Sequence, residues 1–481
     1  MANGGIIGTV NNPTSSTATG VWQQEEQYEA KVTGTWPQRA LFTTKSCRFN
    51  IASSDHLTRS LGGSPTSTRI ATWSYWVKRS TLTASEMIYS NEVADDNNRG
   101  FIQFEDNDSF RMTDSVSSTQ LKTNRLFRDV ASFYHIVLAI DTTQGTAANR
   151  IKLYVNGVQE TSFATASYPN QNDDLKILTG GQTNKQNISK IHGGSSYFGG
   201  YLSEFVFIDG LQLAPTSFGE FDEDSGIWVP IDVSGLTFGN EGFYLNFQTA
   251  AELGDDVSGN TNDFSESNLT ALDQSVDTCT NNFATLNPLI YESRDNTFAE
   301  GNLKITGGGS DSWTNHYGVS TIAVSTGKWF VEAKITTAVG SQGMLGIMGT
   351  STALTGSMKD NGPANIDAGG RITGGGNNIQ TGLTNFANGN IAGAAFDATN
   401  GTIQFYRNGS AYGNAVSSIA SDTYYFVTNS YDAGAVVEFN FGSPPYSESG
   451  GNSDGNGYGN FSMAVPSGYF ALNTKNLAEY G

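Results

Sequence analysis

Apolar and polar residues alternate over long stretches of this chain, and the alternation predicts β-strands. Because successive side chains of a strand point to opposite faces, such a segment buries one face and exposes the other. The strongest segments are 71–78, 135–141, 150–157, 201–209, 327–335, 391–397, 402–409 and 435–442. Residues 135–141 are almost continuously apolar, which predicts a central strand covered on both faces. Residues 214–219 are expected to form one short helical turn.

Two hairpin signals fall at equivalent places in the two halves of the chain. Asn156-Gly157 and Asn408-Gly409 each follow an alternating segment, and Asn-Gly favours the two-residue turn of a β-hairpin. In each half an earlier apolar segment ends in an aspartate, Asp141 in the first and Asp397 in the second. Short strands at regular spacing indicate antiparallel β-sandwiches. The repeated plan therefore predicts an all-β protein with two such sandwiches, the first with the longer loop.

The composition divides the chain into an N-terminal arm at 1–38, a first sandwich at 39–248, a connector at 249–295 and a second sandwich at 296–481. The arm begins rich in Gly, Asn, Thr and Ser and is too short to fold by itself. Its aromatic side chains need a surface, either in this chain or on a neighbouring subunit. We predict that the arm docks through Trp22, Tyr28 and Trp36. The connector is polar and turn-rich, and part of it could pack as a closing strand.

Acidic residues outnumber basic ones, 46 against 26, and the net charge is -20. A surface of this sign repels a phosphate backbone, so nucleic-acid binding is not expected. The acidity suits either cation binding or plain solubility. No segment reaches the roughly 18–20 consecutive apolar residues of a membrane span, so membrane insertion is not expected. The first residues lack the basic and apolar regions of a signal peptide, and two distant cysteines do not make a disulfide framework, so synthesis in the cytoplasm is predicted.

The first sandwich resembles the laminin-G-like, concanavalin A-like lectin family. The resemblance is carried by Ser74–Lys78, Tyr134–Leu138, Leu153–Gly157 and Gly200–Phe205. The second sandwich is similar to a SPRY domain, through Gly327–Glu332, Phe396-Asp397, Gly401–Gly409, Phe439–Gly442 and Pro466–Tyr469. Both families share a two-sheet, jelly-roll-like plan. The resemblance thus implies two concanavalin A-like sandwiches preceded by an extended arm.

The order of these parts resembles virion proteins of marine tailed bacteriophages. The arm carries Gly20-Val21-Trp22, Glu26-Gln27-Tyr28 and Gly34-Thr35-Trp36-Pro37, and the connector carries Asn281–Pro288. The resemblance implies a non-enzymatic protein of the particle surface, either a tail or head fibre that binds a host-surface glycan or protein, or a capsid decoration or cementing protein without receptor binding. The implied partners are capsid, portal or tail proteins and further copies of this chain, with a trimer as the first expectation for a fibre.

The residues do not predict catalysis. A glycosidase on this fold needs carboxylates at the spacing Glu-x-Asp-x-x-Glu so that two flank the scissile bond. Glu220 and Asp222 match, but Ser225 occupies the third position, and nearby glycine and proline indicate a loop. A polysaccharide-degrading tailspike is therefore the least favoured alternative. The four histidines lack zinc spacing, and His135, within an apolar segment, is interpreted as structural.

Two kinds of ligand remain as hypotheses. Sugar recognition needs aromatic faces beside polar loop groups. The candidates are Tyr197, Tyr201, Trp313 and Tyr317, each of which could instead anchor a loop or the core. Calcium is the cofactor that the sequence suggests, because it prefers hard oxygen ligands. The candidates are Asp95, Asp96, Asp106, Asp108 and Asp256, with a capped polar turn as the alternative for each cluster.

Overall fold

The computed structural model describes most of the chain. The described residues are 30, 43–92, 98–179, 185–191, 194, 196–223, 225–290, 295–308, 316–338, 343–354, 356–429, 433–448 and 450–481. The chain divides into two compact units, Met1–Phe42 and Thr43–Gly481, and the second unit contains both sandwiches. The predictions for Trp22, Tyr28, Trp36, Asp95, Asp96 and Trp313 lie outside the described residues and stay predictions.

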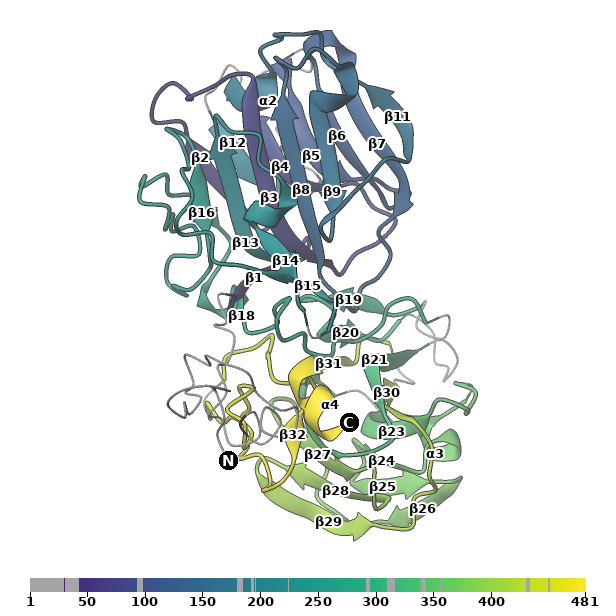
Figure 1. Ribbon diagram of the computed structural model, residues 1–481. Coiled ribbons are helices and arrows are strands. Elements are labelled where there is room, and N and C mark those ends of the chain that lie inside the picture. Colours follow the sequence, from purple (N-terminus) through teal and green to yellow (C-terminus); the bar gives the residue numbers. More distant parts are fainter. Residues whose placement is uncertain are drawn as a thin grey trace, which may run out of the picture. The chain divides into compact units, whose positions relative to one another are not determined.

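The first sandwich contains two sheets of eight strands each (Figure 1). One sheet is made of β1 (Ser46–Phe49), β3 (Ile70–Arg79), β8 (Tyr134–Asp141), β9 (Ile151–Val155), β10 (Val158–Gln159), β13 (Gly200–Asp209), β16 (Phe243–Leu245) and β18 (Gln274–Ser275). Their order is β10-β9-β8-β3-β13-β1-β18, with β16 beside β13. The predicted central strand, β8, therefore has neighbours on both sides.

The second sheet of this sandwich also contains eight strands. It is made of β2 (His56–Ser60), β4 (Glu86–Glu92), β5 (Gly100–Phe104), β6 (Ser109–Asp114), β7 (Thr119–Leu126), β11 (Phe163–Ser167), β12 (Lys185–Ile188) and β17 (Ser265–Ser267). Their order is β11-β7-β6-β5-β4-β12-β2-β17. A short helix, α2 (Lys176–Thr179), and a separate hairpin, β14 (Gly219–Phe221) with β15 (Trp228–Pro230), complete the unit. The helical turn predicted at 214–219 is a 3₁₀ turn at Pro215–Ser217.

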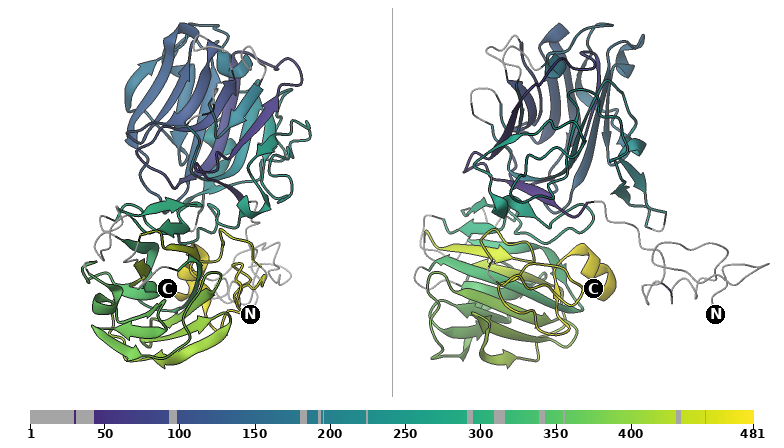
Figure 2. Two further views of the ribbon diagram at one scale, coloured as in Figure 1. Left: turned by 180° about the vertical axis from the view of Figure 1, so that it is seen from behind. Right: turned by 90° about the vertical axis from the view of Figure 1, so that its left-hand side faces the viewer.

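The second sandwich has the same two-layer plan (Figure 2). One sheet contains β19 (Thr297–Ala299), β20 (Lys304–Thr306), β22 (Lys328–Thr337), β27 (Ile391–Asp397), β28 (Thr402–Arg407), β29 (Ser410–Val416), β31 (Val436–Asn440) and β32 (Phe470–Ala471). The other contains β21 (Tyr317–Val324), β23 (Gly343–Gly349), β24 (Ala364–Asp367), β25 (Arg371–Gly374), β26 (Asn377–Gln380) and β30 (Tyr424–Asn429). The helices here are α3 (Met358–Asn361) and α4 (Thr474–Tyr480).

Antiparallel pairing prevails in both sandwiches. In the second, the orders are β19-β20-β31-β22-β27-β28-β29 and β21-β30-β23-β24-β25-β26. Among the described strands, β32 is the exception, because it pairs in parallel with β22. The predicted all-β fold of antiparallel sandwiches is confirmed. In the described part of the chain, every helix is too short or too polar to cross a membrane.

The core of the first sandwich follows the alternation of its strands. In β3, Trp73 and Tyr75 point between the sheets, where they pack in a large apolar cluster. Burying side chains of this size contributes roughly 1.5–3 kcal/mol each. The opposite face of this sheet is also covered: Val137 and Val206 pack in a second cluster with residues of the segment 213–244. This sheet is therefore buried on both faces, and its outward polar residues are buried with it.

The two Asn-Gly turns are built alike, down to their hydrogen bonds. Asn156 and Gly157 have φ of 48° and 79°, and Asn408 and Gly409 have 47° and 83°. The Oδ1 atom of Asn156 accepts a bond of 2.7 Å from the backbone N–H of His135, and Asn408 Oδ1 accepts one of 2.8 Å from Ile391. Each asparagine N–H also donates to the carbonyl of the same partner, at 2.9 Å in both cases. The predicted hairpin repeat is confirmed at atomic detail.

The segment between the sandwiches is closely built into the fold. Of residues 249–295, β17 pairs with β2 and β18 pairs with β1, so both sheets of the first sandwich gain a strand from it. The buried guanidinium of Arg48 donates to the Leu272 carbonyl at 2.9 Å. Just after this segment, the Gly301 carbonyl accepts a hydrogen bond of 3.0 Å from the Tyr201 hydroxyl. These contacts fix the segment against strands that come early in the chain.

Candidate binding site

The outward face of the second sheet of the first sandwich carries a row of residues, all polar except Phe101, that crosses all its strands. The row is defined by register, since each member is the cross-strand partner of the next: Ser167, Gln120, Thr113, Phe101, Ser90, Asn187, Thr58 and Ser265. Cross-strand partners share a face, and neighbouring strands lie about 4.8 Å apart. Phe101, Ser90 and Asn187 are buried, so the row is open toward its ends.

A pocket of about 430 Å³ occupies the β6–β7–β11 end of this row. Its lining is dominated by hydroxyl and amide groups: Arg99, Thr113, Asp114, Ser115, Ser118, Thr119, Gln120, Thr165 and Ser167. A pocket of this size can hold one or two sugar rings, which bind through several weak polar contacts to such groups. Of these, Thr113, Gln120, Thr165 and Ser167 come from outward positions of strands whose inward neighbours, such as Phe110 and Leu121, fill the core.

Several of the pocket's polar groups are available to a ligand. In the described part of the chain, the hydroxyls of Thr165 and Ser167 make no hydrogen bond, and Ser115 Oγ is buried without a described partner. A buried hydroxyl without a partner costs about 1–3 kcal/mol. The Ser115 Oγ atom is closed off from solvent, so the hydroxyls that a ligand can reach are those of the half-buried Thr165 and Ser167.

Two arginines and a phenylalanine form a rigid wall beside the pocket. The guanidinium carbons of Arg99 and Arg111 lie 5.5 and 5.3 Å from the centre of the Phe101 ring. Arg111 is held by Glu105 at 2.7 Å, and Lys122 binds the same carboxylate. Burial by itself raises the pKa of Glu105, but Lys122 and Arg111 outweigh it and hold that pKa below its usual value. With its amide in the orientation that its neighbours require, Gln120 accepts from Arg111.

The acid in the pocket is not placed as half of a hydrolytic pair. Asp114 accepts from the backbone N–H groups of Ile177 at 2.8 Å and Val116 at 2.9 Å, and burial raises its pKa to about 6. Both its oxygens are thus used to hold α2 and the β6–β7 turn. Glycoside hydrolysis requires two carboxyl groups across the scissile bond. Among the described residues that line the pocket, no second acid faces Asp114.

A serine and a histidine do meet in the first sandwich, but they are not a nucleophilic dyad. The Ser74 Oγ atom lies 2.8 Å from His135 Nε2, and the Trp228 indole N–H donates to His135 Nδ1 at 2.9 Å. Because an indole nitrogen only donates, Nδ1 must accept and Nε2 carries the proton. Burial lowers the pKa of His135 to about 3. This histidine cannot take the serine proton, which confirms its interpretation as structural.

The structure corrects two of the predicted sugar-binding tyrosines. Tyr201 and Tyr317 are 1% and 0% exposed, so neither offers a ring face to a ligand. Their hydroxyls donate to the carbonyls of Gly301 and Gly356, each at 3.0 Å, which makes them anchors of the core and of a loop. Tyr197 is half-buried, and its ring centre lies 5.7 Å from that of His56. It stays a prediction, on a loop outside the pocket.

The calcium prediction is wrong at Asp108. This carboxylate is buried and accepts from Arg79 at 3.1 Å, from Arg128 at 2.8 Å and from the N–H of Thr83 at 2.8 Å. Burial by itself raises its pKa, but these three donors hold the pKa below its usual value. Asp106, two residues earlier, is exposed at the tip of the β5–β6 turn. Among the described residues, no three acidic, histidine or cysteine side chains gather as a metal site.

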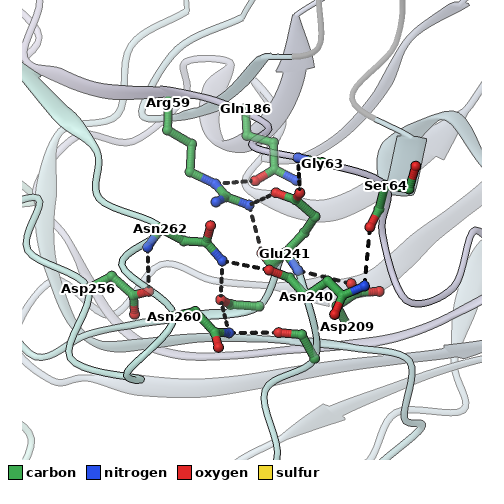
Figure 3. Close-up of polar contacts among 12 residues, drawn as sticks. Arg59, Gly63, Ser64, Gln186, Asp209, Asn240, Glu241, Asp256, Asn260 and Asn262 are labelled. Carbon is green, nitrogen blue, oxygen red and sulfur yellow. Dashed lines mark hydrogen bonds and ion pairs between the residues drawn. The ribbon is translucent and has the colours of Figure 1, made fainter.

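Asp256 is likewise the capping residue of a turn rather than a calcium ligand. Its Oδ1 accepts from the N–H groups of Tyr244 and Ser258, and its Oδ2 accepts from the hydroxyl of Ser258 and the N–H of Asn262. Figure 3 shows how the same turn continues into a closed network. The Asn262 and Asn260 amides donate to the carbonyl of Gly242 at 2.8 and 2.9 Å. With two donors on each oxygen, the acceptor positions of this carboxylate are filled and none is left for a cation, so the prediction is wrong here too.

The polar side chains drawn in Figure 3 bind to one another and to the backbone of neighbouring loops. Arg59, 3% exposed, donates to Gln186 Oε1 at 2.8 Å and to Glu241 Oε2 at 3.1 Å. Glu241 in turn accepts from the N–H of Gly63 at 2.7 Å, and Asp209 accepts from the N–H of Glu241 at 3.1 Å. The carboxylates of Glu241 and Asp209 accept hydrogen bonds from the backbone and side chains of neighbouring loops and so hold these loops together. Their role here is structural.

The acidic run considered for hydrolysis begins in β14 and leads into the turn toward β15. Asp222 Oδ1 accepts from both the N–H and the hydroxyl of Ser225 at 2.8 Å. Glu220 is exposed, two residues earlier in β14. The sequence prediction of a solvated loop agrees with this capped turn.

Comparison with known families bears directly on this geometry, because the pocket lies within one matched segment. Residues 52–211 match the Laminin_G_3 family model. The model describes the concanavalin A-like lectin/glucanases superfamily. The predicted lectin-like character of the first sandwich is thus confirmed over this range, which includes every residue that lines the pocket. No curated protein matches the sequence.

Similar solved structures come from several kinds of protein. The SPRY domain of human HERC1 is 18% identical, with 28% of this chain and 87% of that chain covered and a TM-score of 0.25. A Bacteroides ovatus protein, named as a candidate carbohydrate binding protein, is 16% identical, with coverages of 48% and 61% and a TM-score of 0.32. The heptameric SAP-like pentraxin of Limulus polyphemus is 16% identical, with coverages of 35% and 77% and a TM-score of 0.26.

Proposed function

We propose that this chain is a non-enzymatic glycan-binding protein and that the pocket between β6, β7 and β11 is its binding site. The observation that carries the proposal is the pair of hydroxyls of Thr165 and Ser167, which line one pocket without described partners. The match of residues 52–211 to a lectin and glucanase superfamily supports it. The absence of a second facing acid among the described lining residues favours binding over hydrolysis.

The pocket chemistry suits a sugar better than an apolar ligand. Its hydroxyls both donate and accept, as sugar hydroxyls do, and the guanidinium of Arg111 keeps the Gln120 amide in place. Phe101 supplies an apolar element at the wall, although its ring is covered by the two arginines. We expect specificity to come from hydrogen-bond geometry rather than from stacking, because the Phe101 ring is buried.

We also propose that the protein is displayed on a bacteriophage particle, as an adhesin that reaches a host-surface glycan. The support is the resemblance of the arm and of Asn281–Pro288 to virion proteins. In this role the arm, with Trp22, Tyr28 and Trp36, docks on capsid, portal or tail proteins, and copies of the chain assemble symmetrically. Immunogold labelling of purified particles with an antibody to the full chain tests this role. Label on head or tail fibres supports it, and unlabelled particles contradict it.

Substitution in the pocket is expected to weaken glycan binding. Replacing Thr165 by valine or Ser167 by alanine removes one hydroxyl without changing the strand, and each loss of a neutral hydrogen bond costs about 1 kcal/mol, or about fivefold in affinity. The double variant is expected to lose more than tenfold by the same arithmetic. Binding is measured with the full chain on an array of bacterial surface polysaccharides, followed by titration calorimetry on the strongest hit.

The matched control is Thr402→Val, which removes a strand hydroxyl from β28 in the second sandwich. Its affinity is expected to equal that of the unchanged protein. If the pocket variants and the control bind alike, the glycan site lies elsewhere. If no polysaccharide binds the unchanged protein, the adhesin proposal fails and a decoration role without receptor binding becomes the better explanation.

A further inference from the structure

A lysine, an aspartate and an asparagine meet at a buried point between β3 and the segment that follows β18. Lys78 Nζ lies 2.8 Å from Asp277 Oδ2 and 2.8 Å from Asn282 Oδ1, and it also donates to the Phe283 carbonyl at 3.2 Å. The side chains of Lys78 and Asp277 are 1% and 2% exposed. A primary amine and a carboxyl group are therefore held together away from water, beside the partly buried carboxamide of Asn282.

The surroundings of the amine are aromatic, which keeps water away from it. The Lys78 Nζ atom lies 5.9 Å from the ring centre of Phe133 and 5.5 Å from that of Tyr201. Burial raises the pKa of the Asp277 carboxyl, against the opposing effect of Lys78. Transfer of the ammonium proton to Asp277 converts a buried ion pair into a neutral amine and a neutral acid. Because isolating charges from water is costly, such a transfer is easier here than at the surface.

The carboxamide is fixed in position on several sides. Asn282 Nδ2 donates to the Ala131 carbonyl at 2.5 Å, and the Asn282 N–H donates to the Thr474 hydroxyl at 3.0 Å. Asp277 Oδ1 accepts from the N–H of Phe283, which directly follows Asn282, at 3.0 Å. A carbonyl bond is about 1.2 Å long, so an amine 2.8 Å from Oδ1 is at most about 4 Å from the Asn282 carbonyl carbon. Fixed groups at this range react far more readily than free ones.

We propose that Lys78 and Asn282 become joined by an intramolecular isopeptide bond, with Asp277 as the proton-transfer group. Asp277 takes a proton from the Lys78 ammonium, and the free amine attacks Cγ of Asn282. The new Nζ–Cγ bond forms, the Cγ–Nδ2 bond breaks, and Nδ2 leaves with the transferred protons. An ammonium and a primary carboxamide thus become a secondary amide and an ammonium ion, with no oxidant or external reagent.

The link would tie the first sandwich to the segment that leads into the second. Lys78 and Asn282 are separated by 204 positions in the sequence, so one bond closes a very long loop. A pulling force applied along the chain would then pass through the isopeptide bond, and the residues between Lys78 and Asn282 would not be stretched. This property is independent of whether the pocket binds a glycan.

The test is the intact mass of the denatured full chain. We expect it to be lower than the sequence mass by one molecule of ammonia, and digestion is expected to release a branched peptide that joins the two segments. A mass equal to that of the sequence overturns the proposal. Loss of one water instead of ammonia would place the link on Asp277 and overturn the role given to Asn282.

Variants separate this reaction from other losses of ammonia, since Asn-Gly sequences also lose ammonia when they cyclise. Lys78→Arg keeps the positive charge but removes the nucleophilic amine, and Asp277→Asn removes the proton acceptor at almost unchanged shape. Both are expected to restore the full mass, after correction for the substitution.

The matched control is Lys328→Arg, at a half-exposed lysine 3.4 Å from Asp397, which is expected to keep the loss. If the loss persists in Lys78→Arg, the proposal is wrong. The branched peptide of the unchanged protein gives a reading that does not depend on how the variants fold.

Discussion

Replacing Gly157 by alanine is expected to lower the free energy of unfolding by about 2–5 kcal/mol, from left-handed backbone strain together with overpacking. Gly157 has φ of 79°, which an L side chain adopts at a cost. A Cβ atom at this position would lie 2.8 Å from Cδ2 of the Trp228 indole and closer still to Cε3 and Cζ3. The indole would have to move, and its hydrogen bond to His135 Nδ1, now 2.9 Å, would be lost inside the core.

The second Asn-Gly turn supplies a matched control for this prediction. Gly409 has φ of 83°, but a methyl group there would have Met463 Cγ as its nearest neighbour, at 3.9 Å. Gly409→Ala is therefore expected to cost only the backbone strain, about 1–2 kcal/mol. Urea unfolding followed by tryptophan fluorescence, with circular dichroism for the second sandwich, measures both. Equal losses at the two glycines would show that contact with Trp228 contributes nothing.

This pair of turns shows what the sequence could and could not predict. Asn-Gly fixes the backbone locally, so the turns at Asn156 and Asn408 were predictable from four or five residues. The contact between Gly157 and Trp228 depends on the β14–β15 hairpin returning over the sheet, which no local pattern encodes. Local chemistry therefore predicted the element but not its packing.

The tyrosine predictions failed for a related reason. Tyr201 lies on the outward face of β13, and an outward aromatic residue in a sandwich is ordinarily exposed. Here the segment that carries Phe218, Val233 and Phe238 covers part of this face, and Tyr201 packs with Trp76, Phe133 and Trp228. A second apolar layer of this kind is irregular in sequence, so periodicity does not reveal it.

The pocket was missed because its signal is distributed over distant strands. Thr113, Gln120 and Ser167 are ordinary outward residues of β6, β7 and β11, and nothing in the sequence distinguishes them from other strand hydroxyls. Their alternation with core residues was visible, and it does place them on the outer face. The register that places them in one row could not be read from the sequence, because it depends on how the three strands pair. The acidic clusters had the opposite problem, since aspartates that cap turns and aspartates that bind calcium have the same sequence signature.

Replacing Glu204 by glutamine is expected to stabilise the protein above pH 7 by about 3 kcal/mol, because a shift of one pKa unit corresponds to about 1.4 kcal/mol. Glu204 is 5% exposed, and its Oε2 accepts from the Tyr244 hydroxyl. Burial raises the pKa of Glu204 to about 7 from an ordinary value of 4.5. The folded state therefore binds this proton more tightly than the unfolded state does.

The sign of the pH dependence comes from that difference. The stabilisation by Glu204 is fully present below pH 4.5 and is lost as the pH rises through 7, where the folded protein must hold a buried carboxylate. Burial raises the pKa values of Glu86 and Glu332 to about 7 as well, so both variants are expected to keep part of this pH dependence. The measurement is the urea unfolding free energy at several values between pH 4.5 and 8.5, for the unchanged protein, Glu204→Gln and the exposed control Glu223→Gln. The Glu204→Gln curve should separate upward from the other two as the pH rises through 7, because glutamine keeps an acceptor for Tyr244 and cannot ionise. Three parallel curves would mean that water or a counter-charge already reaches the Glu204 carboxylate in the folded state.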